Sequence, residues 1–232
     1  MNGQFEAWLQ ERFSGWLSAR GQPVPTAALR ISPALAPWEA YYFDLGLRED
    51  LFRVDEKQDV QGELLHGLMD GGAADVASYP LFSGGPPARL IRENVCQLAA
   101  ASCLIYQRGW LREHVSLVPG KPEHHSTSAG FELLLRASGQ ALIWVEAKRS
   151  RAELEKLVSD LRACSRRGRH AQSDCGFPQN HPRYEFALSV RPQFLWAVAP
   201  DGDLSFAVQC EQGGLMLEPL ESLPHRSRFE QG

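Results

Sequence analysis

The sequence predicts a mixed α/β protein in which helices cover the faces of a central mixed sheet and a partly helical N-terminal region comes first. Apolar residues recur at three- and four-residue spacing in 4–20 and 89–107, which is typical of amphipathic helices. Short apolar runs at 131–136, 141–148 and 194–199 are typical of buried strands. With 232 residues, of which 44% are hydrophobic and 22% charged, the chain can bury a sizeable core without covalent staples.

Composition excludes several classes of protein. The five cysteines are odd in number and contain no C-x-x-C pair, so we expect a reducing, cytoplasmic compartment rather than a disulfide framework. The first residues carry acidic side chains and no apolar run of the kind found in signal peptides. No apolar stretch approaches the roughly 18 residues that a membrane span needs, so we expect no membrane partner. Fibrous, secreted and membrane classes are therefore excluded.

The N-terminal region, residues 1–80, is acidic, with 12 acids and 6 bases. Its amphipathic helix carries one stripe of large apolar residues: Phe5, Trp8, Leu9, Phe13, Trp16 and Leu17. Such a stripe is expected to pack inside the protein rather than to bind a cofactor. An alternative function is that the acidic, aromatic region as a whole docks a protein partner or a second copy of the chain. A proline-rich connector follows at 21–37, then a segment at 38–54 that fits helix or strand, and an acidic, glycine-containing segment at 55–75.

The glycine- and proline-rich sequence at 79–87 is the best candidate for a domain boundary. After it the signals become regular: a helix at 89–107, strands at 110–118, 131–136 and 141–148, a further helix, and strands at 194–199 and 204–208. Ser150 and Glu153 form a capping-box pattern that opens the second helix. We therefore predict a core at 89–210 and a C-terminal tail at 211–232, frayed from Pro219 onward.

Two charged residues interrupt a segment that otherwise reads as a buried strand. Glu146 and Lys148 lie in LIWVEAK, where unpaired charges would cost several kcal/mol. Residues two apart on a strand point to the same face, so these two side chains are neighbours. Glu132 sits in an equally apolar setting, FELLL, on the preceding strand.

The register between these two strands decides whether the carboxylates meet. If the connecting loop has three residues, 138–140, Glu132 lies directly opposite Glu146. A two-residue loop would pair Glu132 with Val145 and turn the two carboxylates to opposite faces of the sheet. The site prediction therefore depends on one specific register.

Two carboxylates in a semi-buried place repel each other and need a cation. Mg²⁺ or Mn²⁺ prefers oxygen ligands and keeps several waters, and a divalent ion acts as a Lewis acid and lowers the pKa of a bound water. Beside it, Lys148 could orient that water or stabilise charge on a phosphate. This combination suits phosphodiester hydrolysis. The alternative is an internal Glu–Lys ion pair with a structural role.

The order helix, three strands, helix, strand resembles the restriction-endonuclease-like (PD-(D/E)xK) nuclease superfamily over residues 89–210. By this resemblance, Glu132 matches the acid at the start of the second strand, and Glu146 and Lys148 match the (D/E)xK element. Glu93 matches an acid that many members contribute to the metal site from the first helix, and Gln97 lies one turn further on. The family usually has Asp where this chain has Glu132.

The resemblance implies an α/β core of αβββαβ order and a Mg²⁺- or Mn²⁺-dependent endonuclease with Glu132, Glu146 and Glu93 as metal ligands and Lys148 as the catalytic cation. The implied substrate is nucleic acid, DNA rather than RNA, in a bacterial defence or mobile-element system. Because inactive members of the family carry changes like Glu132, the alternative is a nuclease-fold module that binds nucleic acid or a protein without cleavage.

Positive charge is concentrated directly after the E-x-K element: residues 147–170 hold eight bases and three acids. In the family, the helix that follows this element lies beside the nucleic-acid cleft, so the basic side chains are expected to contact phosphates without reading sequence. The candidates are Arg149, Arg151, Lys156, Arg166, Arg167 and Arg169. The alternative for all of them is a solvated helix face.

A second set of metal-ligating residue types lies close by in the sequence. Cys164, His170, Cys175 and His181 could hold zinc tetrahedrally, although their spacings match no compact zinc motif. A polar loop rich in Arg, Gln and Asn accounts for the same residues equally well. The sequence leaves these two interpretations open.

Overall fold

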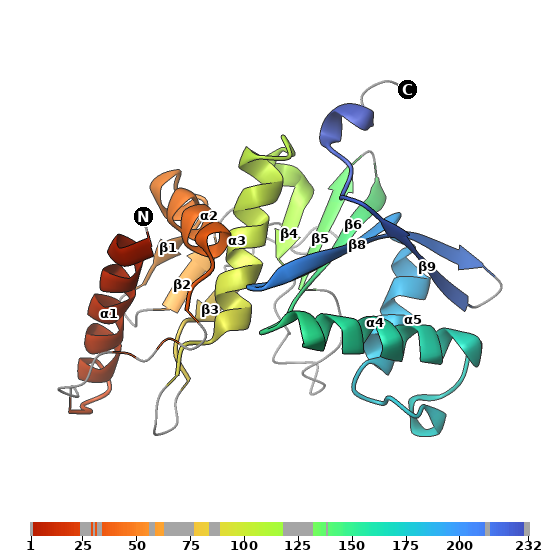
Figure 1. Cartoon of the computed structure of the whole chain (residues 1–232), viewed down its shortest axis with the longest axis horizontal. Coiled ribbons are helices and arrows are strands. Elements are labelled where there is room, and N and C mark those ends of the chain that lie inside the picture. Colours follow the sequence, from red (N-terminus) through yellow and green to blue (C-terminus); the bar gives the residue numbers. More distant parts are fainter. Residues whose placement is uncertain are drawn as a thin grey trace.

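The computed structural model of the chain (Figure 1) confirms the mixed α/β class. It describes residues 2–23, 29, 31, 34–55, 59–62, 77–83, 89–117, 132–137, 139–211 and 214–229. About half of the proline-rich connector and most of the acidic segment at 55–75 lie outside these residues. Among the described residues, no helix combines the length and the apolar character that crossing a membrane requires.

The helices and strands follow one another along the chain as α1 (Asn2–Ser18), α2 (Pro37–Arg48), β1 (Arg53–Val54), β2 (Asp59–Gly62), β3 (Ala77–Pro80), α3 (Arg92–Tyr106), β4 (Val115–Leu117), β5 (Leu133–Ala137), β6 (Gln140–Ala147), α4 (Arg151–Arg166), α5 (His181–Val190), β7 (Phe194–Ala199), β8 (Gly202–Glu211) and β9 (Gly214–Leu220). Short 3₁₀ turns lie at Arg112–His114, Gln172–Asp174 and Arg226–Arg228. Strands β1, β2 and β3 form a small antiparallel sheet.

The central sheet has six strands in the order β4-β5-β6-β7-β8-β9. Neighbouring strands run antiparallel except β6 and β7, which are parallel because the chain crosses over through α4 and α5 between them. After Ala147 the ladder continues for one more bond, since the amide of Lys148 donates to the carbonyl of Val198 at 2.9 Å. This fixes the backbone of Lys148 at the carboxyl end of β6.

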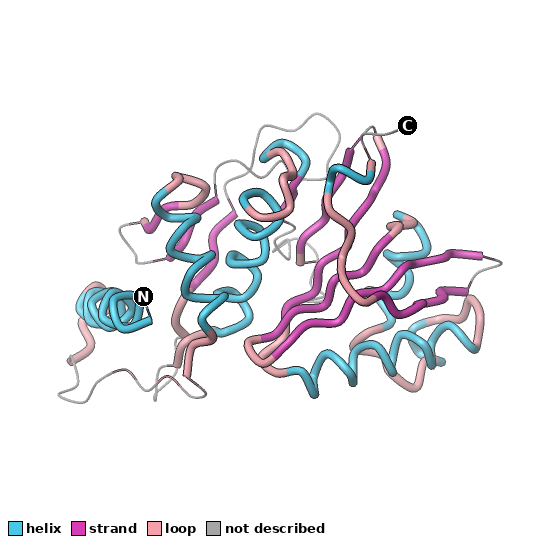
Figure 2. The backbone as a smooth tube through the Cα atoms, turned by 45° about the horizontal axis from the view of Figure 1, so that its top comes forward, coloured by secondary structure: helices cyan, strands magenta, loops and turns pink. Residues whose placement is uncertain are grey.

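Helices cover both faces of this sheet (Figure 2). Residues Ile143 and Val145 of β6 belong to the hydrophobic cluster that includes the buried face of α3. Trp144 points to the other face and shares a second cluster with Leu161 of α4 and Tyr184 of α5. The alternation of side chains along β6 therefore separates a face covered by α3 from a face covered by α4 and α5.

The N-terminal region shares one hydrophobic core with the central sheet. The apolar stripe of α1 is buried as predicted, and Phe13 and Trp16 pack against Phe82. The segment that fitted helix or strand is mainly the helix α2, which packs against α3. The stripe is therefore used inside the chain, with Trp8 only partly buried, and docking of a partner by the N-terminal region stays a prediction.

A buried ion pair ties α2 to α3. Arg92 donates to both carboxylate oxygens of Glu39, at 3.2 and 2.5 Å, and both side chains are almost fully buried. The thiol of Cys96 donates to the same carboxylate at 3.0 Å. Since a buried carboxylate is tolerated only when it is paired and hydrogen-bonded, this arrangement fixes how the two helices meet.

β5 and β6 meet in the register that the site prediction requires. Leu133 pairs with Val145, which sets Glu132 directly opposite Glu146. Both carboxylates therefore lie on the face covered by α4 and α5, at the end of the hairpin farthest from its turn.

The hairpin reaches this register by an unexpected route. Ala137 pairs with Gln140, so the turn has two residues rather than three, and Gly139 adopts a φ of 73° in it, while Ser138 lies outside the described residues. The pairing then skips Leu142, and this bulge shifts the register by one residue. The expectation that a two-residue loop would separate the carboxylates is therefore wrong, because the bulge compensates for the short turn.

Most predicted elements of 89–210 are confirmed, with ends that shift by a few residues. The predicted strand at 110–118 is shorter: β4 covers three residues after a 3₁₀ turn, and residue 118 lies outside the described part. After residue 89, one helix and one strand were missed. Helix α5 follows the basic segment, and β9 lies within the predicted tail, where Pro219 is paired with Phe206 and Leu223 is buried.

Candidate active site

Glu146 is the buried anchor of the site. Its position on β6, between strands on both sides, leaves its side chain with no exposed surface. The indole N–H of Trp144 donates to Oε1 at 2.8 Å, and Nε of Arg183 donates to Oε2 at 2.8 Å. Both carboxylate oxygens therefore have partners, as a buried charge requires.

Glu132 faces Glu146 from the residue before β5. The backbone amide of Ala147 donates to Oε2, and Nζ of Lys148 donates to Oε1 at 2.8 Å. From α3, the side-chain amide Nε2 of Gln97 donates to the backbone carbonyl of Glu132 at 2.6 Å. Gln97, placed one turn after Glu93 in the sequence, thus holds the start of β5 rather than the carboxylate itself.

Lys148 and Arg183 lie between the two carboxylates. Nζ of Lys148 is 2.8 Å from Oε1 of Glu132 and 3.5 Å from Oε2 of Glu146. Arg183, from the first turn of α5, is 2.8 Å from Glu146 and 3.9 Å from Glu132. One oxygen of each carboxylate therefore converges on the same pair of cations, and two negative charges are balanced by two positive ones.

Burial and this mixture of charges shift the pKa values of the site. Burial, and then the neighbouring charge of Glu146, raise the pKa of Glu132 to about 7, against the opposing effect of Lys148. Burial alone would lower the pKa of Lys148, but the two carboxylates outweigh it and raise it. The charge of Glu146 raises the pKa of Arg183. At neutral pH the two cations stay charged, whereas Glu132 titrates.

Glu93, the third predicted metal ligand, is not brought into this group. Among the described residues, Glu93, Glu132 and Glu146 do not form a set whose ligand atoms all lie within 4.8 Å of one another. Glu93 belongs to the first turn of α3, which packs on the other face of the sheet, and its charge still acts on Arg149 and on Arg183 in the site. The compact group therefore consists of Glu132 and Glu146, and a metal-ligand role for Glu93 stays a prediction.

Arg183 is the functional side chain that the sequence did not reveal. It lies 37 residues after Glu146 and reaches the site only because α5 folds back under β6. The one local signal is Pro182, which occupies the first turn of α5 and is typical of a helix start. That signal could have located α5 but not the contact of Arg183 with Glu146.

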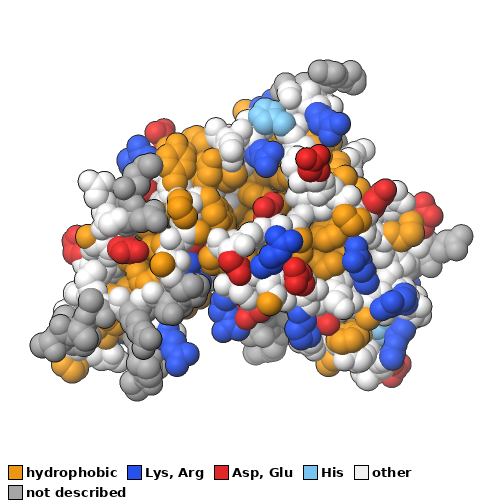
Figure 3. All heavy atoms as spheres, viewed as in Figure 1, with side chains coloured by type: hydrophobic (Ala, Val, Ile, Leu, Met, Phe, Trp, Pro, Cys, Tyr) orange, Lys and Arg blue, Asp and Glu red, His pale blue; other side chains and the backbone are white. Residues whose placement is uncertain are grey.

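The predicted basic residues fall into two groups. The first three form i,i+4 ion pairs along α4: Arg149 with Glu153, Arg151 with Glu155, and Lys156 with Asp160. Figure 3 shows this pattern as Lys and Arg side chains interspersed with Asp and Glu. These three residues therefore fit the alternative of a solvated helix face.

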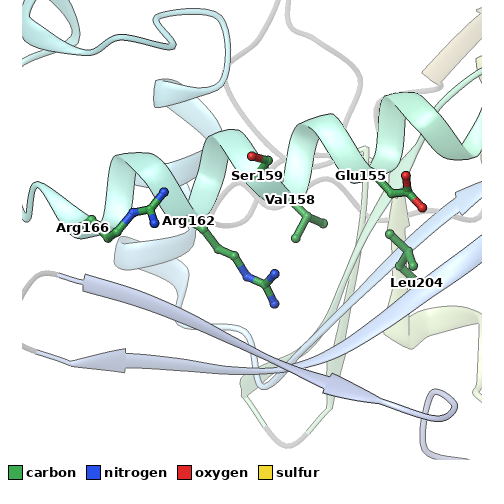
Figure 4. Close-up of a pocket in the computed structure, with 6 residues that line it drawn as sticks. All are labelled: Glu155, Val158, Ser159, Arg162, Arg166 and Leu204. Carbon is green, nitrogen blue, oxygen red and sulfur yellow. The ribbon is translucent and has the colours of Figure 1, made fainter.

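The second group lies at the end of α4 and just beyond it. Arg166 lines a groove of about 420 Å³ together with Glu155, Val158, Ser159, Arg162 and Leu204 (Figure 4). Arg167 donates to the carbonyl of Asp174 at 2.6 Å, and Arg169 is exposed. Arg162, which also lines the groove, donates to the carbonyl of Leu217 in β9 at 2.9 Å.

The start of α4 shows half of the predicted capping box. The side-chain oxygen of Ser150 accepts from the amide of Glu153 at 3.4 Å. The carboxylate of Glu153 binds the guanidinium of Arg149 at 2.6 Å instead of the backbone of Ser150. The cap starts α4 two residues after Lys148, whose backbone is held by its own bond to β7.

Comparison of the chain with protein-family models, curated proteins and solved structures found no match. The arrangement of side chains is therefore the basis for proposing a function. It offers two facing carboxylates, a lysine and an arginine at the carboxyl end of a central strand.

Proposed function

We propose that this protein is a metal-dependent nuclease that hydrolyses phosphodiester bonds in nucleic acid, DNA rather than RNA, through a restriction-endonuclease-like core. The order α3, β4, β5, β6, α4, β7 supports this reading, with β4 to β6 antiparallel and β7 parallel to β6. Within that order, the acid lies at the start of the second strand and E-x-K at the end of the third, as the resemblance requires.

The observation that carries the proposal is the convergence of Glu132 and Glu146. One oxygen of each lies beside the same Lys148 ammonium, at 2.8 and 3.5 Å, so both point into the space that this cation occupies and that a divalent ion could take in its place. Magnesium binds proteins through one or two carboxylates and keeps several waters, and hard oxygen donors are its preferred ligands. The donor set therefore fits Mg²⁺ or Mn²⁺, held by Glu132 and Glu146.

When bound, the divalent ion would polarise a phosphate oxygen as a Lewis acid. The chain's own cations complete the chemistry. Lys148 and Arg183 hold the carboxylates in ion pairs, and a metal ion would release them toward the incoming phosphate. The ammonium of Lys148 would then orient the attacking water or stabilise charge on the phosphate, while the planar guanidinium of Arg183 can bind two phosphate oxygens.

Substrate contacts outside the site would come from the exposed basic side chains at the end of α4 and in the loop after it. Arg166, at the groove of Figure 4, and Arg169 stand free of the i,i+4 pairing that occupies Arg149, Arg151 and Lys156. Contacts of this kind bind any sequence and weaken with salt. We therefore expect affinity without sequence preference from this surface.

The test is cleavage of supercoiled plasmid and of single-stranded DNA and RNA by the full chain with Mg²⁺ or Mn²⁺. Lys148→Ala and Glu146→Gln are expected to abolish cleavage. The matched controls are Arg48→Ala, which removes an exposed ion pair with Asp44, and Glu218→Gln, on the exposed side of β9. Loss of cleavage in the site variants but not in the controls supports the proposal. Equal metal-dependent cleavage by Lys148→Ala would overturn it.

A second function is favoured by the completeness of the ion-pair network. Lys148 and Arg183 already balance the two carboxylates, so the site is stable as a structural element without a metal ion. In that case the chain is a nuclease-fold module that binds nucleic acid or a protein without cutting. Salt-dependent binding of DNA that survives Lys148→Ala, with no cleavage in Mg²⁺ or Mn²⁺, would favour this reading.

A further inference from the structure

Two cysteines and a histidine come together at the far end of α4, away from the carboxylates. Cys164 lies in the last turn of α4, His170 in the loop that follows, and Cys175 directly after the 3₁₀ turn Gln172–Asp174. The two sulfur atoms and a ring nitrogen of His170 all lie within 4.8 Å of one another. Both cysteines are buried, at 1% and 7% exposure. Among the described residues, this is the one group of three such side chains.

Hydrogen bonds orient the histidine ring toward the sulfurs. Nδ1 of His170 lies 2.7 Å from the carbonyl of Gly168, and because a carbonyl only accepts, Nδ1 carries the proton. Nε2 then has a lone pair, and this atom is buried with no hydrogen-bond partner among the described residues. A histidine that binds a metal usually donates its other ring N–H to a carbonyl or carboxylate in this way.

The sulfur atoms are arranged as a pair of ligands. Their separation is 3.1 Å, well beyond the roughly 2.05 Å of a disulfide bond. Two sulfurs bound to one tetrahedral zinc at about 2.3 Å each lie about 3.8 Å apart, so an ion requires them to separate by less than 1 Å. The amide of Phe177 donates to Sγ of Cys175 at 3.4 Å, a contact that stabilises a thiolate.

A shell of contacts around the three side chains holds them in place. Nε2 of His181 lies 2.9 Å from the carbonyl of His170 and donates to it, and the two rings meet edge to face with centroids 4.7 Å apart. The hydroxyl of Tyr184 donates to the carbonyl of Gly168 at 3.1 Å. His181, one of the four residues considered from the sequence, therefore supports the loop and is not a ligand.

We propose that Cys164, His170 and Cys175 form a zinc site with two thiolates, the Nε2 atom of the imidazole and a water as the fourth ligand. Thiolate and imidazole donors select zinc over the hard cations that suit carboxylates. The ion would tie the loop between α4 and α5 to the end of α4. That loop carries Arg167 and Arg169 and leads directly into α5, which presents Arg183 to the carboxylates.

The site does not depend on the proposed nuclease activity, so its test is metal binding. The full chain is reduced, freed of metal, dialysed against Zn²⁺ and analysed for metal content by mass spectrometry. One zinc per chain is expected. Cys175→Ser and His170→Ala are expected to reduce this at least tenfold, whereas Cys210→Ser, which alters a cysteine outside the group, retains it. His170→Cys, which replaces one ligand by another, is expected to restore binding.

Cobalt provides a second measurement that does not rely on the variants folding normally. Co²⁺ bound to the wild-type chain is expected to give the intense near-ultraviolet absorption of cobalt–thiolate bonds, and Zn²⁺ is expected to bleach it. Absence of this band, zinc content below one-tenth per chain, or equal zinc in Cys175→Ser would overturn the proposal. A wild-type chain that oxidises to a Cys164–Cys175 disulfide in preference to binding Zn²⁺ would also overturn it.

Discussion

Replacing Arg183 by alanine tests whether α5 completes the carboxylate site. The side chain of Glu146 has no exposed surface, and Nε of Arg183 lies 2.8 Å from its Oε2 atom. Removing the guanidinium leaves a buried carboxylate with fewer partners, which is one of the few ways that a single substitution strongly destabilises a protein. We expect Arg183→Ala to lower the free energy of unfolding by about 3 kcal/mol.

The magnitude follows from the contacts. Two unit charges at 2.8 Å attract by about 6 kcal/mol at an effective dielectric constant of about 20. Part of this is offset, because the variant no longer has to desolvate the guanidinium. Glu146 also keeps Lys148 at 3.5 Å and the indole N–H of Trp144 at 2.8 Å. Breaking one partner of a buried pair costs about 3–5 kcal/mol, and the remaining partners place this case at the lower end.

The assay is urea denaturation of Arg183→Ala, of Glu146→Gln and of the double variant. Because the two side chains touch, their effects should not add, and the double variant is expected to be more stable than the sum predicts by about 1–3 kcal/mol. Arg48→Ala is the matched control, and its exposed pair with Asp44 should change stability by less than about 0.5 kcal/mol. A loss below about 1 kcal/mol for Arg183→Ala, or strict additivity, would refute the reasoning.

Three further outcomes follow from the structure. The pKa of Glu132 is raised to about 7, chiefly by burial and then by the charge of Glu146, and a carboxyl whose folded pKa is raised loses stability as pH rises through that value. In EDTA, the melting temperature of the wild type relative to Glu132→Gln should therefore rise from pH 8 to pH 6, and parallel pH curves would contradict this. In Gly46→Ala, the new methyl group would overlap the ring of Phe52, and a loss of about 2–3 kcal/mol is expected in urea denaturation; an unchanged midpoint would show a looser contact. Ser150→Ala removes the cap of α4 and should lower the free energy of unfolding by about 1 kcal/mol in the same assay, and Ser150→Asp should restore most of this loss. Equal stability of Ser150→Ala and the wild type would contradict the cap.

The fold was predictable wherever one face of an element is apolar and the other polar. The stripe of α1 shows this clearly, because its side chains follow the helical period. β6 and β7 were predicted from a different signal, a short continuous apolar run, because both of their faces are buried. α5 was missed although its buried residues, Tyr184, Ala187 and Leu188, keep helical spacing, because the apolar Phe186 and Val190 lie between and beyond them and blur the apolar face in the sequence. β9 was missed because Pro219 argues against a strand, although an edge strand tolerates it.

The candidate site was predictable in part for a different reason. Glu146 and Lys148 stand out because they are charged residues in an otherwise apolar segment, and this contrast can be seen in the local sequence. The contact of Arg183 and the separation of Glu93 depend on how helices pack on the sheet, which no local pattern encodes. The Cys164, His170 and Cys175 group likewise became visible only when the loop after α4 closed on itself.

The bulge at Leu142 makes the length of a surface turn matter at a distance. Exposed surface loops usually accept insertions and deletions, because few contacts depend on their length. Here a residue added to or lost from the turn, unless the bulge absorbs it, would move Glu132 to the face opposite Glu146, although the turn at 138–139 is six or seven residues away from Glu132. Natural variation in the length of this turn should therefore be rare, and any that occurs should be accompanied by a change at the bulge.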